Sequence, residues 1–74
     1  MLMDKDIALQ VSNIMIELSS KLNQSIVLVQ NNCSNEDFEA YRQKAGYIMG
    51  TIYTDIMLPI YKRYPEIEPN ELKD

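Results

Sequence analysis

The chain has 74 residues, of which 46% are hydrophobic and 24% charged, and its net charge is −4. Such a length allows one small domain at most, and this composition is typical of a folded domain. Because there is no histidine and only one cysteine, a Ser–His–Asp or Cys–His catalytic arrangement, a four-ligand zinc site and an internal disulfide are all excluded. We therefore expect a protein that is not an enzyme and holds no cofactor or metal.

The first predicted helix covers about residues 5–31. Glycine and proline are absent from this segment, and Asp4 or Asp6 supplies a capping carboxylate at the positive end of the helix dipole. Apolar side chains recur at helical spacing. The main stripe consists of Ile7, Val11, Ile14, Leu18, Leu22, Ser25 and Val29, widened on one side by Ala8, Met15 and Ile26. A second stripe of Leu9, Ile16 and Val27 lies on the back of the helix.

A turn is predicted at residues 31–35, which read Asn-Asn-Cys-Ser-Asn. Asparagine tolerates the backbone conformations that end helices. Ser34 followed by Asp37 resembles a capping box, in which the serine hydroxyl caps the next helix. This pattern places the start of the second helix at about residue 35.

The second predicted helix covers about residues 35–63. Its apolar sector spans more than half of its circumference and includes Phe38, Ala45, Met49, Ile52 and Ile56. Pro59 cannot donate a hydrogen bond to the carbonyl four residues earlier and clashes with that turn. We expect either a kink at 55–59 or a break, with a short extra helix near 59–64. Pro65 disfavours helix at the residue before it, which ends the segment.

The sequence divides into a helical hairpin over residues 1–64 and an acidic tail over residues 65–74. Pro69 is placed to start a short turn over residues 70–72, which Ile67 and Leu72 would dock. A frayed, solvated tail is the alternative.

Nucleic acid and membrane are not expected partners. The seven lysine and arginine residues are scattered, whereas a phosphate-binding surface needs them clustered. Residues 45–61 form the longest apolar stretch, but Asp55 and Pro59 interrupt it and it falls short of about 20 residues. The N-terminal residues lack a basic region followed by an apolar run. We expect a cytoplasmic protein.

Both helices carry more apolar surface than one hairpin can bury, and such surface marks an interface. The sequence predicts an all-α helical hairpin that dimerises into a four-helix bundle. Gly46 and Gly50 would let another backbone approach closely. The predicted dimer interface consists of Val11, Leu18, Leu22, Gly46, Met49, Gly50, Tyr53 and Met57.

A further protein partner is expected on a flank rich in tyrosine and methionine, because tyrosine has a large apolar body and a polar tip. This surface consists of Tyr53, Met57, Tyr61 and Tyr64. Packing within the dimer explains the same residues equally well. Asp55 is expected to face water. The predicted function is that of a non-enzymatic interaction protein, such as an adaptor, a regulator or an immunity-type binder. The alternative is a bundle that binds a small molecule or metal at the dimer core.

Overall fold

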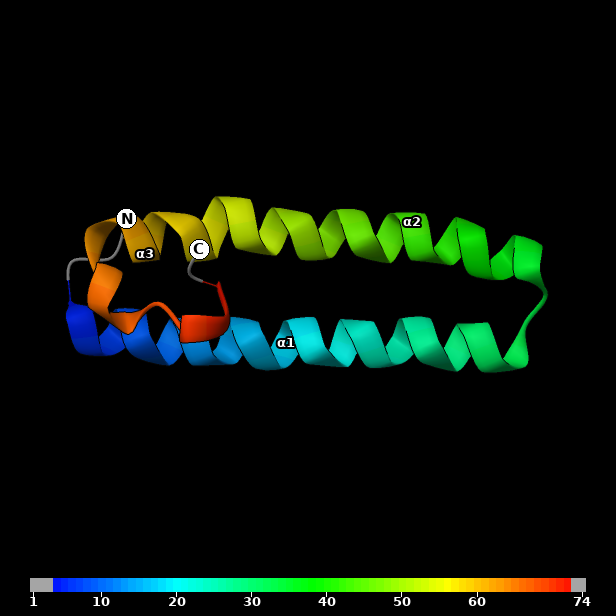
Figure 1. Cartoon of the computed structure of the whole chain (residues 1–74), viewed down its shortest axis with the longest axis horizontal. Coiled ribbons are helices and arrows are strands. Elements are labelled where there is room, and N and C mark those ends of the chain that lie inside the picture. Colours follow the sequence, from blue (N-terminus) through cyan, green and yellow to red (C-terminus); the bar gives the residue numbers. More distant parts are fainter. Residues whose placement is uncertain (1–3, 73–74) are drawn as a thin grey trace.

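The computed structural model describes residues 4–72, which form an antiparallel helical hairpin (Figure 1). Two short turns follow the hairpin. Between residues 4 and 72 there is no strand, so the all-α prediction is confirmed. The elements in chain order are α1 (Lys5–Asn32), α2 (Asn35–Ile52), the π turn η1 (Tyr53–Met57), α3 (Leu58–Arg63), and the 3-10 turns η2 (Pro65–Ile67) and η3 (Asn70–Leu72).

Both long helices begin where a capping side chain satisfies their first N–H groups. The Asp4 carboxylate accepts hydrogen bonds from the backbone N–H groups of Asp6 at 2.9 Å and Ile7 at 3.2 Å. The Ser34 hydroxyl accepts one from the N–H of Asp37 at 3.1 Å. Only two residues separate α1 from α2, so the helices lie side by side along their whole length. The predicted positions of the caps and the turn are confirmed.

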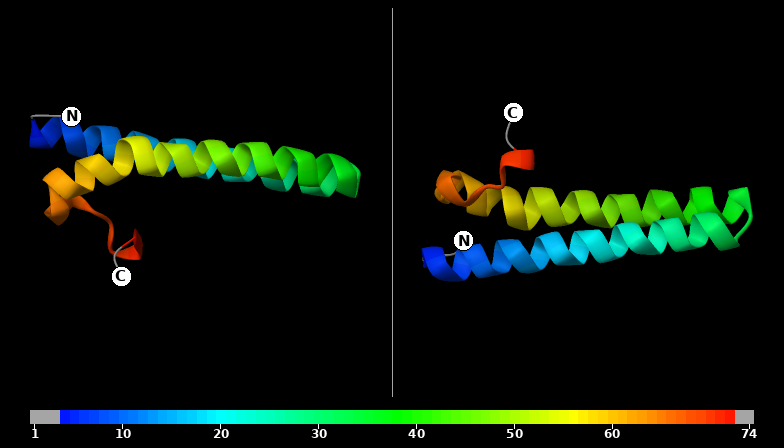
Figure 2. Two further views of the ribbon diagram at one scale, coloured as in Figure 1. Left: turned by 90° about the horizontal axis from the view of Figure 1, so that it is seen from above. Right: turned by 60° about the horizontal axis from the view of Figure 1, so that its bottom comes forward.

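Pro59 is accommodated by a π turn and a new helix. In η1 the Leu58 N–H donates to the carbonyl of Tyr53, five residues earlier instead of four. The wider turn relieves the clash that the proline ring causes in a regular helix, and Pro59 then lies in the first turn of α3. Figure 2 shows that α3 bends away from the line of α2. The predicted extra helix is confirmed, while the π turn that joins it to α2 was not foreseen.

The core lies at the open end of the hairpin, where α1 begins and α3 ends. Its buried apolar residues are Ala8, Ile52, Met57, Ile60 and Tyr61. Toward the turn, Ala45 is the one buried residue among those described. The half of the hairpin near the turn is therefore thinly packed.

The face of α1 that contacts α2 is rotated by about one residue from the predicted main stripe. Residues spaced alternately by four and three positions form the contact, and each is buried or half-buried. They are Ala8, Ser12, Met15, Ser19, Leu22, Ile26 and Val29. Ile7, Ile14 and Leu18, which belong to the predicted main stripe, are exposed in the single hairpin. Small residues in the contact allow α1 and α3 to approach closely enough for Ser12 and Tyr61 to share a hydrogen bond of 2.5 Å.

The tail folds back along one side of the hairpin (Figure 2). Ile67 packs against the core, and the Lys5 ammonium lies 2.9 Å from the Glu66 carboxylate. The Leu72 N–H donates to the Pro69 carbonyl at 3.0 Å and closes the turn predicted there. The tail therefore partly covers one face of the hairpin and leaves the opposite face uncovered.

Candidate functional site

The uncovered face, which we call the open face, carries large apolar side chains from both long helices. Ile14 on α1 is 56% exposed and Ile48 on α2 is 52% exposed. The Ser25 and Tyr41 hydroxyls, 2.7 Å apart, join the two helices at the same edge. The exposed apolar members of the open face are Ile7, Ile14 and Leu18 from α1, and Tyr41 and Ile48 from α2. They form an apolar strip that runs along the length of the hairpin.

The chain exposes more surface than a compact protein of the same mass. Its accessible area is 5389 Å², whereas a compact monomer of 8.6 kDa exposes roughly 4,700 Å². The excess of roughly 700 Å² is close to the ~800 Å² that each partner buries in a standard protein interface. Part of this excess follows from the elongated shape of the hairpin, which measures 44 × 22 × 15 Å.

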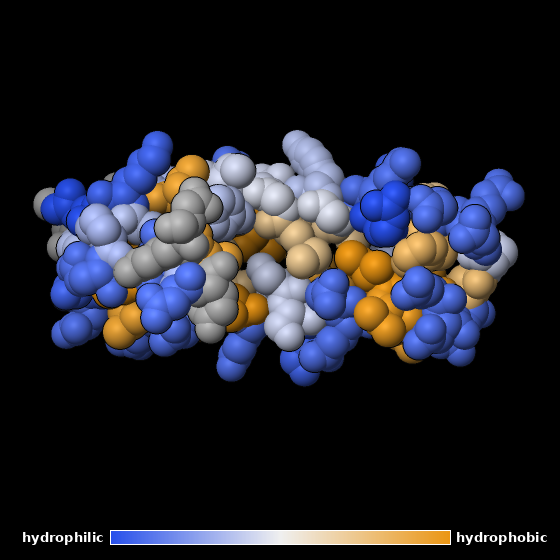
Figure 3. Space-filling view, viewed as in Figure 1, coloured by the Kyte–Doolittle hydropathy of each residue, from blue (hydrophilic) through white to orange (hydrophobic). Residues whose placement is uncertain are grey.

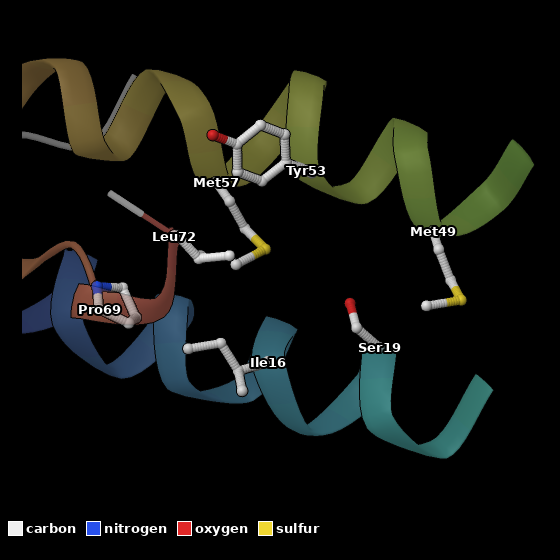
Figure 4. Close-up of a pocket in the computed structure, with 7 residues that line it drawn as sticks. All are labelled: Ile16, Ser19, Met49, Tyr53, Met57, Pro69 and Leu72. Atoms are coloured by element: carbon white, nitrogen blue, oxygen red, sulfur yellow. The ribbon is translucent and has the colours of Figure 1, made fainter. Parts of the chain in front are cut away.

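The opposite face, which we call the tail face, contains a groove of about 470 Å³ between α1, η1 and the tail (Figure 4). Its lining is mainly apolar, and the thioethers of both lining methionines point into it. Figure 3 shows apolar side chains along the hollow between the helices on this side. The lining residues are Ile16 and Ser19 from α1, Met49, Tyr53 and Met57 from the second arm of the hairpin (α2, η1 and α3), and Pro69 and Leu72 from the tail.

The residues of the predicted dimer interface lie in three places. Val11 and Leu18 border or lie on the open face, while Gly46, Gly50 and Tyr53 lie toward the tail face. Leu22, Met49 and Met57 lie between the helices, where the two methionines also line the groove of the tail face. No side chain lies within 4 Å of a Cβ built on either glycine. In the single hairpin the eight residues are thus spread over two faces and the space between the helices, and the dimer interface itself stays a prediction.

The predicted partner surface is divided between the core and the surface. Tyr61 and Met57 are buried in the hairpin, where another protein cannot reach them. The π turn is the physical reason, because its extra residue rotates the side chains that follow it onto the inner face. Tyr53 and Tyr64 are half-buried, and the Tyr64 ring lies 5.5 Å from the Arg63 guanidinium. Only these two of the four predicted residues remain accessible.

Charged side chains lie at the surface and form local pairs. Asp55 is exposed, as expected. The Lys5 ammonium, by donating a hydrogen bond to Glu66, lowers the pKa of that carboxyl below its ordinary value. In the part of the chain that the structure describes, no three histidine, cysteine, aspartate or glutamate residues lie close enough to hold a metal ion.

Several members of these surfaces were missed by the sequence analysis. Ile7, Ile14 and Ile48 were visible as apolar residues at helical spacing, but none of them was included in the predicted interface or partner surface. Pro69 and Leu72 were predicted to form a docked turn, but no local pattern says which face a turn will dock on.

Comparisons with protein-family models, with curated proteins and with solved structures found no match for this chain. Within residues 4–72, no helix has the length and apolar character needed to cross a membrane.

Proposed function

We propose that this chain is a non-enzymatic interaction protein that acts as a homodimer, in which the open faces of two hairpins pack into a four-helix bundle. The observation that carries the proposal is the apolar strip of the open face, which includes Ile7, Ile14, Leu18 and Ile48. Burial of such side chains in a partner contributes about 1.5–3 kcal/mol for each fully buried residue.

A second copy is the occupant that best fits the size of this strip. The surface excess matches one standard interface per chain. A two-fold axis through the open face pairs the strip with itself, so that apolar residues from one chain meet apolar residues from the other. Such pairing would bury Ile7, Ile14 and Leu18 of α1 together with Tyr41 and Ile48 of α2, all of which are exposed in the single chain.

The dimer would leave the tail face free for a further protein. That face includes Tyr53, the two exposed glycines Gly46 and Gly50, and the groove beside the tail. An adaptor or regulator of this size, acting in the cytoplasm, is the role that we propose for it.

The test is the molar mass in solution, measured by light scattering coupled to size exclusion over a hundredfold range of protein concentration. We expect a mass of twice 8.6 kDa. Ile14→Glu would introduce a carboxylate at the centre of the strip and should convert the protein to a monomer that remains helical by circular dichroism. Val27→Glu is the matched control, because Val27 is exposed on the other side of the same helix, and it should leave the dimer intact.

Two results would count against the proposal. One is a mass of 8.6 kDa at every concentration. The other is a dimer that survives Ile14→Glu but dissociates with Val27→Glu, which would move the interface to the tail face.

A further inference from the structure

We propose that the groove on the tail face binds an elongated, uncharged aliphatic molecule, with the C-terminal turn η3 as one wall of the site. The groove lies on the face opposite the proposed dimer interface, so this inference does not depend on the dimer. It rests on the dimensions of the groove, on the chemistry of its lining and on the charge of the tail beside it.

The dimensions fit a small ligand. A volume of about 470 Å³ falls in the range of roughly 300–1,000 Å³ that is usual for small-molecule sites. From Met49 to Met57 the groove follows the helix for eight residues, which corresponds to about 12 Å. The long direction of the site therefore suits a straight chain rather than a compact ring system.

The side chains that line the groove favour an apolar ligand. Ile16, Leu72 and Pro69 offer aliphatic walls, and the flexible thioethers of Met49 and Met57 can adapt to the shape of an alkyl chain. Among the residues that the structure describes, no acidic or basic side chain lines the groove. Figure 4 shows the hydroxyl of Ser19 directed into the space between the helices, where it can exchange one hydrogen bond with a ligand hydroxyl.

Charge excludes an anionic head group. The part of the tail that the structure describes, residues 65–72, contains three acidic residues and no basic one. Glu68 directly precedes Pro69 at the groove wall. Among the described residues, the groove lining offers a ligand carboxylate no cationic partner, and Glu68 beside Pro69 carries a like charge. Both features disfavour an anionic head group in an apolar groove.

The test is a titration of the full chain with 1-decanol, followed by the methyl signals of methionines labelled with ¹³C. We expect the Met49 and Met57 methyl signals to shift and to saturate. The signal of the Met15 methyl should stay in place as an internal reference, because Met15 packs against the core cluster and is not among the described residues that line the groove. Decanoate, which has the same chain length but a charged head, should bind at least tenfold more weakly at pH 7.

Three variants locate the site. Ser19→Leu fills the groove without removing apolar surface, and Ile16→Thr removes part of a wall, so each should weaken binding at least tenfold. Val27→Thr changes a residue on the same side of α1 that does not line the groove, and it should bind 1-decanol like the parent chain. The Ile14→Glu variant should also bind like the parent, whatever its oligomeric state, which separates this test from that of the dimer.

The proposal is overturned if no methyl signal shifts, or if the shifts grow linearly without saturation. Equal movement of the Met15, Met49 and Met57 signals would indicate nonspecific partition into the core and would also overturn it. Equal affinity for decanoate would refute the assignment of an uncharged ligand.

Discussion

The hydrogen bond between Ser12 and Tyr61 gives a direct test of how α1 packs against α3. Their hydroxyl oxygens lie 2.5 Å apart, and the two residues are only 1% and 3% exposed. Every buried polar side-chain atom in the described residues has a partner. Removing one hydroxyl of the pair would leave the other without its partner in a site from which water is excluded.

The magnitudes follow from what each remaining hydroxyl can still do. In Ser12→Ala the Tyr61 phenol loses its hydrogen-bond partner among the described residues, and an unsatisfied buried hydroxyl costs about 1–3 kcal/mol. Alanine has a higher helix propensity than serine, which offsets part of this loss. In Tyr61→Phe the serine hydroxyl can still donate to the carbonyl four residues earlier in its own helix, so we expect a loss of only about 1 kcal/mol.

The variant that carries both substitutions gives the coupling energy between Ser12 and Tyr61. With both hydroxyls gone, neither is left unsatisfied, so the double variant should be more stable than the sum of the single losses implies, by about 1 kcal/mol. The assay is urea unfolding followed by circular dichroism, with all four proteins at one concentration because self-association raises apparent stability. A coupling energy within about 0.3 kcal/mol of zero would refute the packing described for this end of the hairpin.

Three further predictions concern the helices and the tail. Gly46→Ala and Gly50→Ala should each raise the free energy of unfolding by about 1 kcal/mol, since both positions are exposed helix interior with open space at the Cβ; a loss in urea unfolding would show that another chain covers them. Asp4→Ala should lower it by about 1 kcal/mol, because two N–H groups lose their acceptor, and an unchanged urea midpoint would contradict this. The pKa of Glu66 is lowered by Lys5, so its contribution is present above the ordinary pKa of the carboxyl and is lost as the pH falls through the lower value. The melting temperature should therefore fall less on acidification in Lys5→Met than in the parent chain, and parallel curves would contradict it.

The features that could be predicted from the sequence are those decided within a few residues. Asp4 and Ser34 cap helices because each side chain reaches N–H groups two or three residues ahead. The short link between the helices fixes their antiparallel order. Pro65 ends α3 through its effect on the residue directly before it.

The rotation of α1 could not be predicted in the same way, because it depends on a residue far along the chain. A pattern of hydrophobicity favours the stripe with the largest side chains, which contains Ile7 and Ile14. The structure instead buries Ala8 and Ser12, and the volume that these small residues leave is filled from the second arm by Tyr61. Forty-nine positions separate Ser12 from its partner, so no local pattern reports the pair.

The candidate surfaces were predicted less well than the helices for the same reason. Tyr61 and Met57 were assigned to the surface because a regular helix would carry them onto the flank with Tyr53. A single inserted residue in η1 changes which side chains face inward for the rest of that arm. Sequence shows that Pro59 must disturb the helix, but several local structures relieve the strain, and tertiary packing chooses between them.

The position of the tail limits which face of the hairpin can contact another copy of the chain. A bare hairpin with apolar side chains on both faces could stack through each of them, and contacts that do not close generate open filaments. Here η2 and η3 lie over one end of the tail face, tied there by the packing of Ile67 and by the pair between Lys5 and Glu66. The open face is left without such a cover. In the proposed dimer this asymmetry favours one closed, two-fold contact and keeps the groove of the tail face accessible in both chains.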